Sequence, residues 1–206
     1  MVSQIELNKA LDLMNLSWTK QDDTRDFATE FIYTAQSVDE LLFECNKKGI
    51  KDTSYVLHRW YNYQTSKNCE ELFSKHGAVK EKNETHKEID FYINGVPFDL
   101  KLSVYPAALK DKPFDIKNHK DKDFLVQWFF SNQSNATRRH FANRLFIVCD
   151  GNSVLENMQL KANSDLIEKA IIEYMREHKY YPHLVRIKTD TGYKNVFSDV
   201  ILIKKE

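Results

Sequence analysis

The sequence lacks long apolar runs and has few residues that break secondary structure. Its 206 residues include 5 Gly and 4 Pro, too few to indicate a flexible linker. No apolar run approaches the ~20 residues that span a bilayer. Residues 1–16 contain no signal-type hydrophobic block. We therefore expect a cytoplasmic protein without a membrane segment.

Cysteine is scarce and neither sign of charge is in excess. Cys45, Cys69 and Cys149 are scattered without a Cys-x-x-Cys pair, so neither a zinc site nor a disulfide framework is indicated, and a reducing compartment is favoured. Thirty basic and thirty acidic residues give a formal net charge of zero. This argues against a domain that coats nucleic acid by charge alone, although one basic face remains compatible with it.

The residues that are present indicate a folded α/β chain. The hydrophobic fraction of 42% is ordinary for a globular protein, and the length allows a large core with a helical extension. Apolar residues recur at helical spacing through the first third, most clearly over 38–45 and 55–73, with a possible break near Thr65. We divide the chain into an N-terminal helical region, residues 1–60, and an α/β core, residues 61–206.

After Gly77 the pattern changes to strands. Residues 78–82 form a candidate short strand, and two alternating segments, 88–93 and 96–102, flank Asn94-Gly95. Asn-Gly between alternating segments is a strong hairpin signal because both residues tolerate positive φ. The later chain predicts a helix over 124–141, with a break near 132–135 as an alternative, and a buried strand over 144–149. It also predicts a helix that starts at a cap-like Ser164 and runs to about 179, and a closing hairpin around 190–192. This order predicts a mixed central β-sheet flanked by helices.

Strand alternation predicts how the charged residues of this hairpin are arranged. Asp99 and Lys101 share one face of their strand, and a two-residue turn would pair Asp90 with Asp99 and Glu88 with Lys101. Two carboxylates that face each other destabilise a sheet unless a hard cation lies between them. A lysine beside them can act on water or on a phosphate. The pattern therefore favours a Mg²⁺-type phosphodiesterase site, while the alternative is the solvated face of an edge hairpin.

Asp90, the hairpin and the triplet Asp99-Leu100-Lys101 resemble the (P)D…(D/E)-x-K signature of the PD-(D/E)XK nucleases. The resemblance covers roughly residues 68–150. It implies a restriction-endonuclease-like core in which Asp90, Asp99 and the carbonyl of Leu100 bind Mg²⁺, for which Mn²⁺ substitutes. It also implies that Lys101 assists the water that attacks the phosphate. The sequence departs from the pattern at Ile89, where the family often has proline.

The family usually adds a glutamate from the preceding helix. Two adjacent residues qualify, and Glu70 flanks the apolar stripe of that helix more closely than Glu71. We therefore expect Glu70 to be the further metal ligand, with Glu71 as the alternative.

Basic residues after the hairpin are candidates for contacts with DNA. Lys110 and Lys112 follow the proposed site, and Arg138 and Arg139 form a basic pair among polar residues. They are expected to bind nucleic acid by contacting phosphates. For the lysines, the alternative is a solvated loop, because acidic residues are interleaved with them.

Together these features predict a metal-dependent endonuclease that hydrolyses DNA phosphodiester bonds, with restriction or defence as a candidate role. A homodimer would match a duplex substrate cut on both strands. The alternatives are RNA cleavage by the same cluster and a non-catalytic partner-binding or regulatory protein that retains the nuclease fold.

Overall fold

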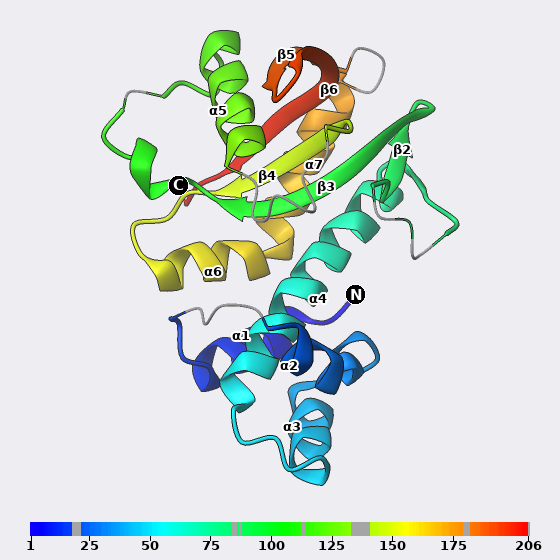
Figure 1. Ribbon diagram of the computed structural model, residues 1–206, viewed down its shortest axis with the longest axis vertical. Coiled ribbons are helices and arrows are strands. Elements are labelled where there is room, and N and C mark those ends of the chain that lie inside the picture. The colour runs from blue at the N-terminus through cyan, green and yellow to red at the C-terminus, as the bar shows by residue number, and fades with distance from the viewer. Residues whose placement is uncertain are drawn as a thin grey trace.

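The computed structural model describes residues 1–17, 22–83, 86, 88–112, 114–132, 141–178 and 182–205. Within them the chain forms an α/β fold around one six-stranded sheet in the order β1-β2-β3-β4-β6-β5, with helices packed against it (Figure 1). The mixed sheet flanked by helices is the fold class that the sequence predicts.

The sheet combines antiparallel edges with a parallel centre. Its strands are β1 Val79–Lys80, β2 Phe91–Ile93, β3 Val96–Val104, β4 Arg144–Cys149, β5 Leu184–Thr189 and β6 Gly192–Ile203. The antiparallel pairs are β1–β2, β2–β3 and β5–β6, whereas β3–β4 and β4–β6 are parallel. Strand β4 lies between two parallel neighbours and is buried along its whole length, as its continuous apolar sequence predicts.

The first part of the chain is helical, as predicted. Its elements are α1 Gln4–Leu13, α2 Asp23–Ala28, the 3₁₀ helix η1 Glu30–Tyr33, α3 Val38–Lys47 and α4 Thr53–Lys75. The four α-helices begin after Ser3, Asp22, Ser37 and Asp52, whose side chains each accept a hydrogen bond from a backbone N–H of the first turn. Helix α4 is continuous, and the Thr65 hydroxyl donates to the Tyr61 carbonyl at 2.8 Å instead of breaking the helix.

The remaining helices are η2 Ala107–Leu109, α5 His119–Ser131, α6 Val154–Ala162 and α7 Ser164–His178. Helix α5 begins five residues earlier than predicted and ends at Ser131; residues 133–140 of the predicted helix lie outside the described residues. Helix α6 was not predicted, although Ser153 caps it. Helix α7 is capped by Asn163, which accepts from the Leu166 N–H at 3.1 Å, so Ser164 is its first residue and not its cap.

The helices cover both faces of the sheet. On one face α4 and α7 pack against the strands, with Phe73 stacked on Phe91 at 4.6 Å between ring centroids. On the other face α5 packs through Phe130 against Phe146 of β4. Because neighbouring residues of β4 enter different clusters, the sheet is the middle of three layers (Figure 1).

Helix α4 belongs to two hydrophobic clusters. Its first half packs with the N-terminal helices and α6 around Trp60, which is fully buried. Its second half packs on the sheet through Leu72 and Phe73. The boundary predicted at residue 60 falls inside this helix, which runs from the N-terminal helices to the β2–β3 hairpin (Figure 1). Among the described residues, no helix is both long enough and apolar enough to cross a bilayer.

Candidate functional site

The hairpin between β2 and β3 forms at the predicted turn. Asn94 has φ 48° and Gly95 has φ 81°, the left-handed conformations that a two-residue turn requires. Ile93 pairs with Val96, and Phe91 pairs with Phe98. The register is therefore the predicted one as far as Phe91.

The predicted pairing does not continue to Asp90. Its N–H donates at 2.9 Å to the carbonyl of Phe98, although Phe98 is already the partner of Phe91. Two successive residues thus face one residue of β3, which is a β-bulge. The expected direct pairs of Asp90 with Asp99 and of Glu88 with Lys101 are absent, because β2 begins only at Phe91. Beyond Phe98, this edge of β3 is therefore no longer paired with β2.

The Asp90 side chain lies at this edge of β3, beyond the last β2–β3 pair. Its Oδ2 accepts a hydrogen bond from the Leu100 N–H at 2.6 Å. The N–H and C=O of one strand residue point to the same edge. The Leu100 carbonyl is therefore directed toward the edge that Asp90 occupies, while the Leu100 side chain is buried in the core between the sheet and α4. Two of the expected metal ligands, the Asp90 carboxylate and the Leu100 carbonyl, thus lie at the same edge of β3.

Asp99 is buried and its carboxylate is paired with two cations. Only 2% of the residue is exposed. Its Oδ1 accepts from the Lys101 amine, and its Oδ2 is 2.7 Å from both Nε and Nη2 of Arg144. Strand pairing explains the second contact, because Arg144 lies directly opposite Asp99 in the parallel β3–β4 register. Sequence reasoning missed Arg144; the signal available was a charged residue at the start of an apolar strand.

Glu70, and not Glu71, lies beside Asp90. Burial and the negative charge of Asp90 raise the pKa of Glu70 to about 7. Within the described residues no group donates a hydrogen bond to the Glu70 carboxylate. Glu71 instead forms an ion pair with the amino group of Met1 at 2.9 Å.

The pKa of Asp90 is also raised, chiefly by burial. The hydrogen bond from Leu100 opposes this shift, whereas the nearby charge of Asp99 adds to it. Asp90 is therefore close to Glu70 on one side and to Asp99 on the other. This places four of the predicted site residues, Glu70, Asp90, Asp99 and Lys101, in one cluster.

The donor set at this edge fits Mg²⁺. Glu70 and Asp90 are partly buried carboxylates that repel each other, and a hard cation would relieve this repulsion. Mg²⁺ commonly uses one or two carboxylates and keeps several waters. Asp99 fits less directly, because its two oxygens already contact Lys101 and Arg144. In the part of the chain that the structure describes, no three His, Cys, Asp or Glu side chains are gathered closely enough to hold a metal ion as they stand.

A pocket opens beside the two carboxylates. It has a volume of about 270 Å³ and lies between α4 and the chain around β1 and β2. Its lining residues are Tyr63, Lys67, Glu70, Lys80, Glu81, Asn83, His86, Ile89 and Asp90. Glu81 is held by hydrogen bonds from the Tyr92 hydroxyl at 2.5 Å and the Asn83 N–H at 2.9 Å. Glu70 and Asp90 are the other two carboxylates that line this pocket.

The residues predicted to bind DNA lie away from this cluster or outside the described residues. The Lys110 amine donates to the Gly151 carbonyl at 3.0 Å, just beyond the C-terminal end of β4. Asp99 is opposite the first residue of β4, and five strand residues correspond to about 16 Å. The Lys112 amine lies over the Phe124 ring, 5.4 Å from its centroid. Arg138 and Arg139 are not among the described residues.

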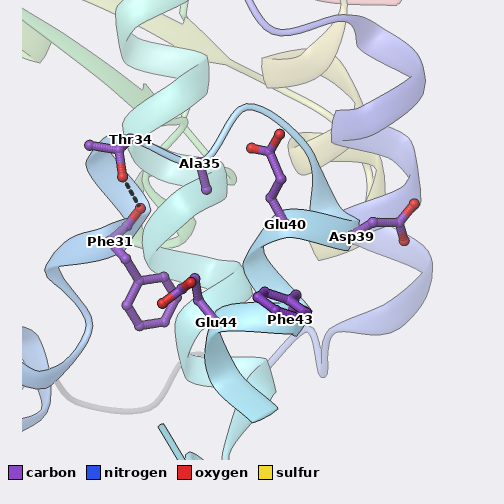
Figure 2. A pocket seen from close by; sticks show the side chains of 7 residues that line it. All are labelled: Phe31, Thr34, Ala35, Asp39, Glu40, Phe43 and Glu44. Carbon is purple, nitrogen blue, oxygen red and sulfur yellow. Dashed lines mark hydrogen bonds between the residues drawn. The ribbon is translucent and has the colours of Figure 1, made fainter. Parts of the chain in front are cut away.

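A second pocket lies on the N-terminal helices, away from the carboxylates. It is lined by residues of η1 and α3, with Phe31 and Phe43 beside Asp39, Glu40 and Glu44, and has a volume of about 620 Å³ (Figure 2). Phe43 is 66% exposed. All three acidic groups already have partners. Asp39 accepts from Lys9 and Glu40 from the Gln36 N–H, each at 2.7 Å, and Glu44 pairs with Lys47 at 3.6 Å. The pocket therefore offers apolar contact area more than unpaired charge.

Comparison of the chain with family models, with curated proteins and with solved structures gives no match. The geometry of the carboxylate–lysine cluster therefore carries the functional argument.

Proposed function

We propose that the protein is a metal-dependent endonuclease that hydrolyses DNA phosphodiester bonds at the edge of β3. The observation that carries the proposal is the proximity of two partly buried carboxylates, Glu70 and Asp90, next to the Asp99–Lys101 ion pair. A protein that used these residues only for folding would gain nothing from keeping two such carboxylates together.

Glu70, Asp90 and the Leu100 carbonyl would hold Mg²⁺ or Mn²⁺. The bound cation supplies Lewis acidity and a water of lowered pKa. Asp90 is held in place by the Leu100 N–H, so its carboxylate stays at the strand edge without help from a mobile side chain. Partial burial of Glu70 and Asp90 strengthens electrostatic contacts with a phosphate at this edge.

Lys101 is the residue that can move toward the substrate. Its side chain is 48% exposed, whereas that of Asp99 is 3% exposed. The amine can leave Asp99 and contact the scissile phosphate or the attacking water. Arg144 then keeps Asp99 neutralised and in place. Asp99 and Arg144 thus act as positioning residues for Lys101. The Asp99 carboxylate would become available to a cation only after the Lys101 amine had moved away from Asp99.

The test is digestion of supercoiled plasmid with Mg²⁺ and, separately, with EDTA. We expect nicking that needs the metal and falls by a factor of roughly 100 or more in Asp90→Asn and Lys101→Met. Asp150→Asn is the matched control, since Asp150 pairs with Lys204 at the far end of the sheet. Cleavage that persists in both site variants would remove this cluster from consideration.

The second candidate is a non-catalytic protein that binds a partner through the pocket of Figure 2. The exposed Phe43 ring beside Phe31 favours it, because an apolar hollow on a surface is a common feature of protein interfaces. Titration with Mn²⁺ separates the two functions. A nuclease binds the ion and loses it in Asp90→Asn, whereas a protein that uses only the helical pocket has no such dependence.

Parallel digestion of duplex DNA, single-stranded DNA and RNA distinguishes deoxyribonuclease from ribonuclease activity, which the same cluster would support. Sedimentation with and without duplex DNA tests the proposed homodimer.

A further inference from the structure

The pocket beside Glu70 and Asp90 carries positive as well as negative side chains. Lys67 projects from α4 and Lys80 from β1, and both line the pocket with the two carboxylates. Both amines are near enough to Glu70 to oppose the rise of its pKa. A purely acidic pocket would repel a phosphodiester, whereas this one is lined by two amines as well as by carboxylates.

One wall of the pocket is aromatic and is held firmly. Tyr63 comes from α4, one turn before Lys67, and its hydroxyl accepts from the Lys67 amine at 3.3 Å. Its ring makes an edge-to-face contact with the ring of Tyr33, with 4.9 Å between the ring centroids. An aromatic wall next to amines is the combination on which unpaired bases and their phosphates bind.

The size of the pocket limits what can enter. Its volume of about 270 Å³ lies just below the range of about 300–1,000 Å³ typical of small-molecule pockets. α4 bounds it on one side and the chain around β1 and β2 on the other. A space of this size is comparable to one nucleotide and smaller than a base pair.

We propose that this pocket is a subsite for one unpaired nucleotide, so that the substrate of the neighbouring cluster is a single strand or a single-stranded region. Lys67 and Lys80 contact phosphates next to the scissile bond, and Tyr63 contacts the base. The inference rests on the proposed nuclease function for its position beside the reacting phosphate. The neutral net charge agrees with it, because a few phosphate contacts need no large basic surface.

Fluorescence anisotropy in EDTA, where hydrolysis is blocked, measures the binding of a short labelled strand. The arms are single-stranded DNA, single-stranded RNA of the same sequence, and the DNA duplex. A single strand should bind more than about tenfold more tightly than the duplex, because a duplex must first unpair and unstack a nucleotide at a cost of a few kcal/mol. The DNA and RNA arms then identify which strand the pocket takes.

Variants locate the binding in the pocket. Lys67→Met and Lys80→Met should each weaken single-strand binding roughly threefold and reduce the slope of log affinity against log salt by about 0.7. Tyr63→Ala should weaken binding while leaving that slope unchanged. Lys75→Met is the control, since Lys75 lies two turns further along α4 and pairs with Glu168 at 2.6 Å.

The outcomes separate this inference from the nuclease proposal. If Mg²⁺-dependent cleavage occurs but the duplex binds as tightly as the single strand, or Lys67→Met equals Lys75→Met, the subsite is wrong and the nuclease proposal stands. If single-strand binding depends on Lys67 and Lys80 but no substrate is cleaved, the subsite stands and the nuclease proposal is wrong.

Discussion

Arg144 and Asp99 form a buried ion pair across the first residue pair of the parallel β3–β4 register, with both Nε and Nη2 of the arginine 2.7 Å from one carboxylate oxygen. The arginine is 3% exposed and the aspartate 2%. The pair therefore fixes where β4 begins relative to β3 and, through Lys101, where the lysine of the cluster rests.

The first prediction concerns this pair. Arg144→Met leaves a buried carboxylate with one cation fewer, so the free energy of unfolding should fall by about 3 kcal/mol. Urea denaturation measures it. The double variant Asp99→Leu with Arg144→Met should recover part of the loss, because neither charge is then left alone. A double variant less stable than Arg144→Met would contradict the assignment of the loss to the unpaired charge.

The second prediction concerns Glu70 in the absence of metal. Its folded pKa of about 7 is above the ordinary value of about 4.3, so the folded state holds the proton more tightly. This stabilisation is complete below about pH 4.3 and is lost as pH rises through 7. Glu70→Gln should therefore be more stable than the wild type above pH 7, by roughly 1 kcal/mol, and equal to it at pH 4. Thermal melts in EDTA measure the difference.

The control for Glu70 is its neighbour. Glu71→Gln loses an ion pair with Met1 and should gain no stability at neutral pH. Added Mg²⁺ should stabilise the wild type more than Glu70→Gln. Equal stabilisation of both would mean that Glu70 is not a ligand.

The third prediction concerns the thiols. Burial raises the pKa of Cys149 to about 12 and raises that of Cys69 as well. Folding is therefore favoured below the ordinary thiol pKa of about 8.5, and this contribution is lost as pH rises from there toward 12. At pH 8 the folded protein should react with iodoacetamide at least about 100-fold more slowly than the urea-unfolded chain. Rapid labelling of Cys149 in the folded state would contradict this.

The fourth prediction tests the N-terminal cluster. Trp60 is fully buried, and its Nε1 donates to the Ala35 carbonyl at 2.9 Å. Trp60→Ala should lower the free energy of unfolding by about 3–5 kcal/mol. Ile5→Ala is a suitable control, because Ile5 is 78% exposed and its truncation should cost little. Unfolding followed by chemical denaturation and circular dichroism gives both values.

Local signals made the hairpin predictable. Asn94 and Gly95 favour positive φ wherever they stand in a chain, and the alternating residues around them set the register through Phe91. The positions of Asp99 and Lys101 on one strand followed from alternation alone. The choice of Glu70 over Glu71 followed from the buried stripe of a helix whose period is fixed.

Long-range packing decided the features that the sequence left open. The bulge at Asp90 depends on where β2 leaves β3, and Phe91 is held there by Phe73 of α4. Arg144 reaches Asp99 only because the parallel register aligns strands 45 residues apart. Lys110 follows β3 in sequence, yet the length of that strand carries it to the opposite end of the sheet.

Helix α4 is one continuous helix that joins the N-terminal helices to the edge of β3. Its 23 residues correspond to a length of about 34 Å, with Trp60 anchored among the N-terminal helices and Glu70 beside the β3 edge. A partner or strand that tilts the N-terminal helices would therefore shift Glu70 relative to Asp90, so that the proposed cleavage would respond to binding many ångströms away from Asp90.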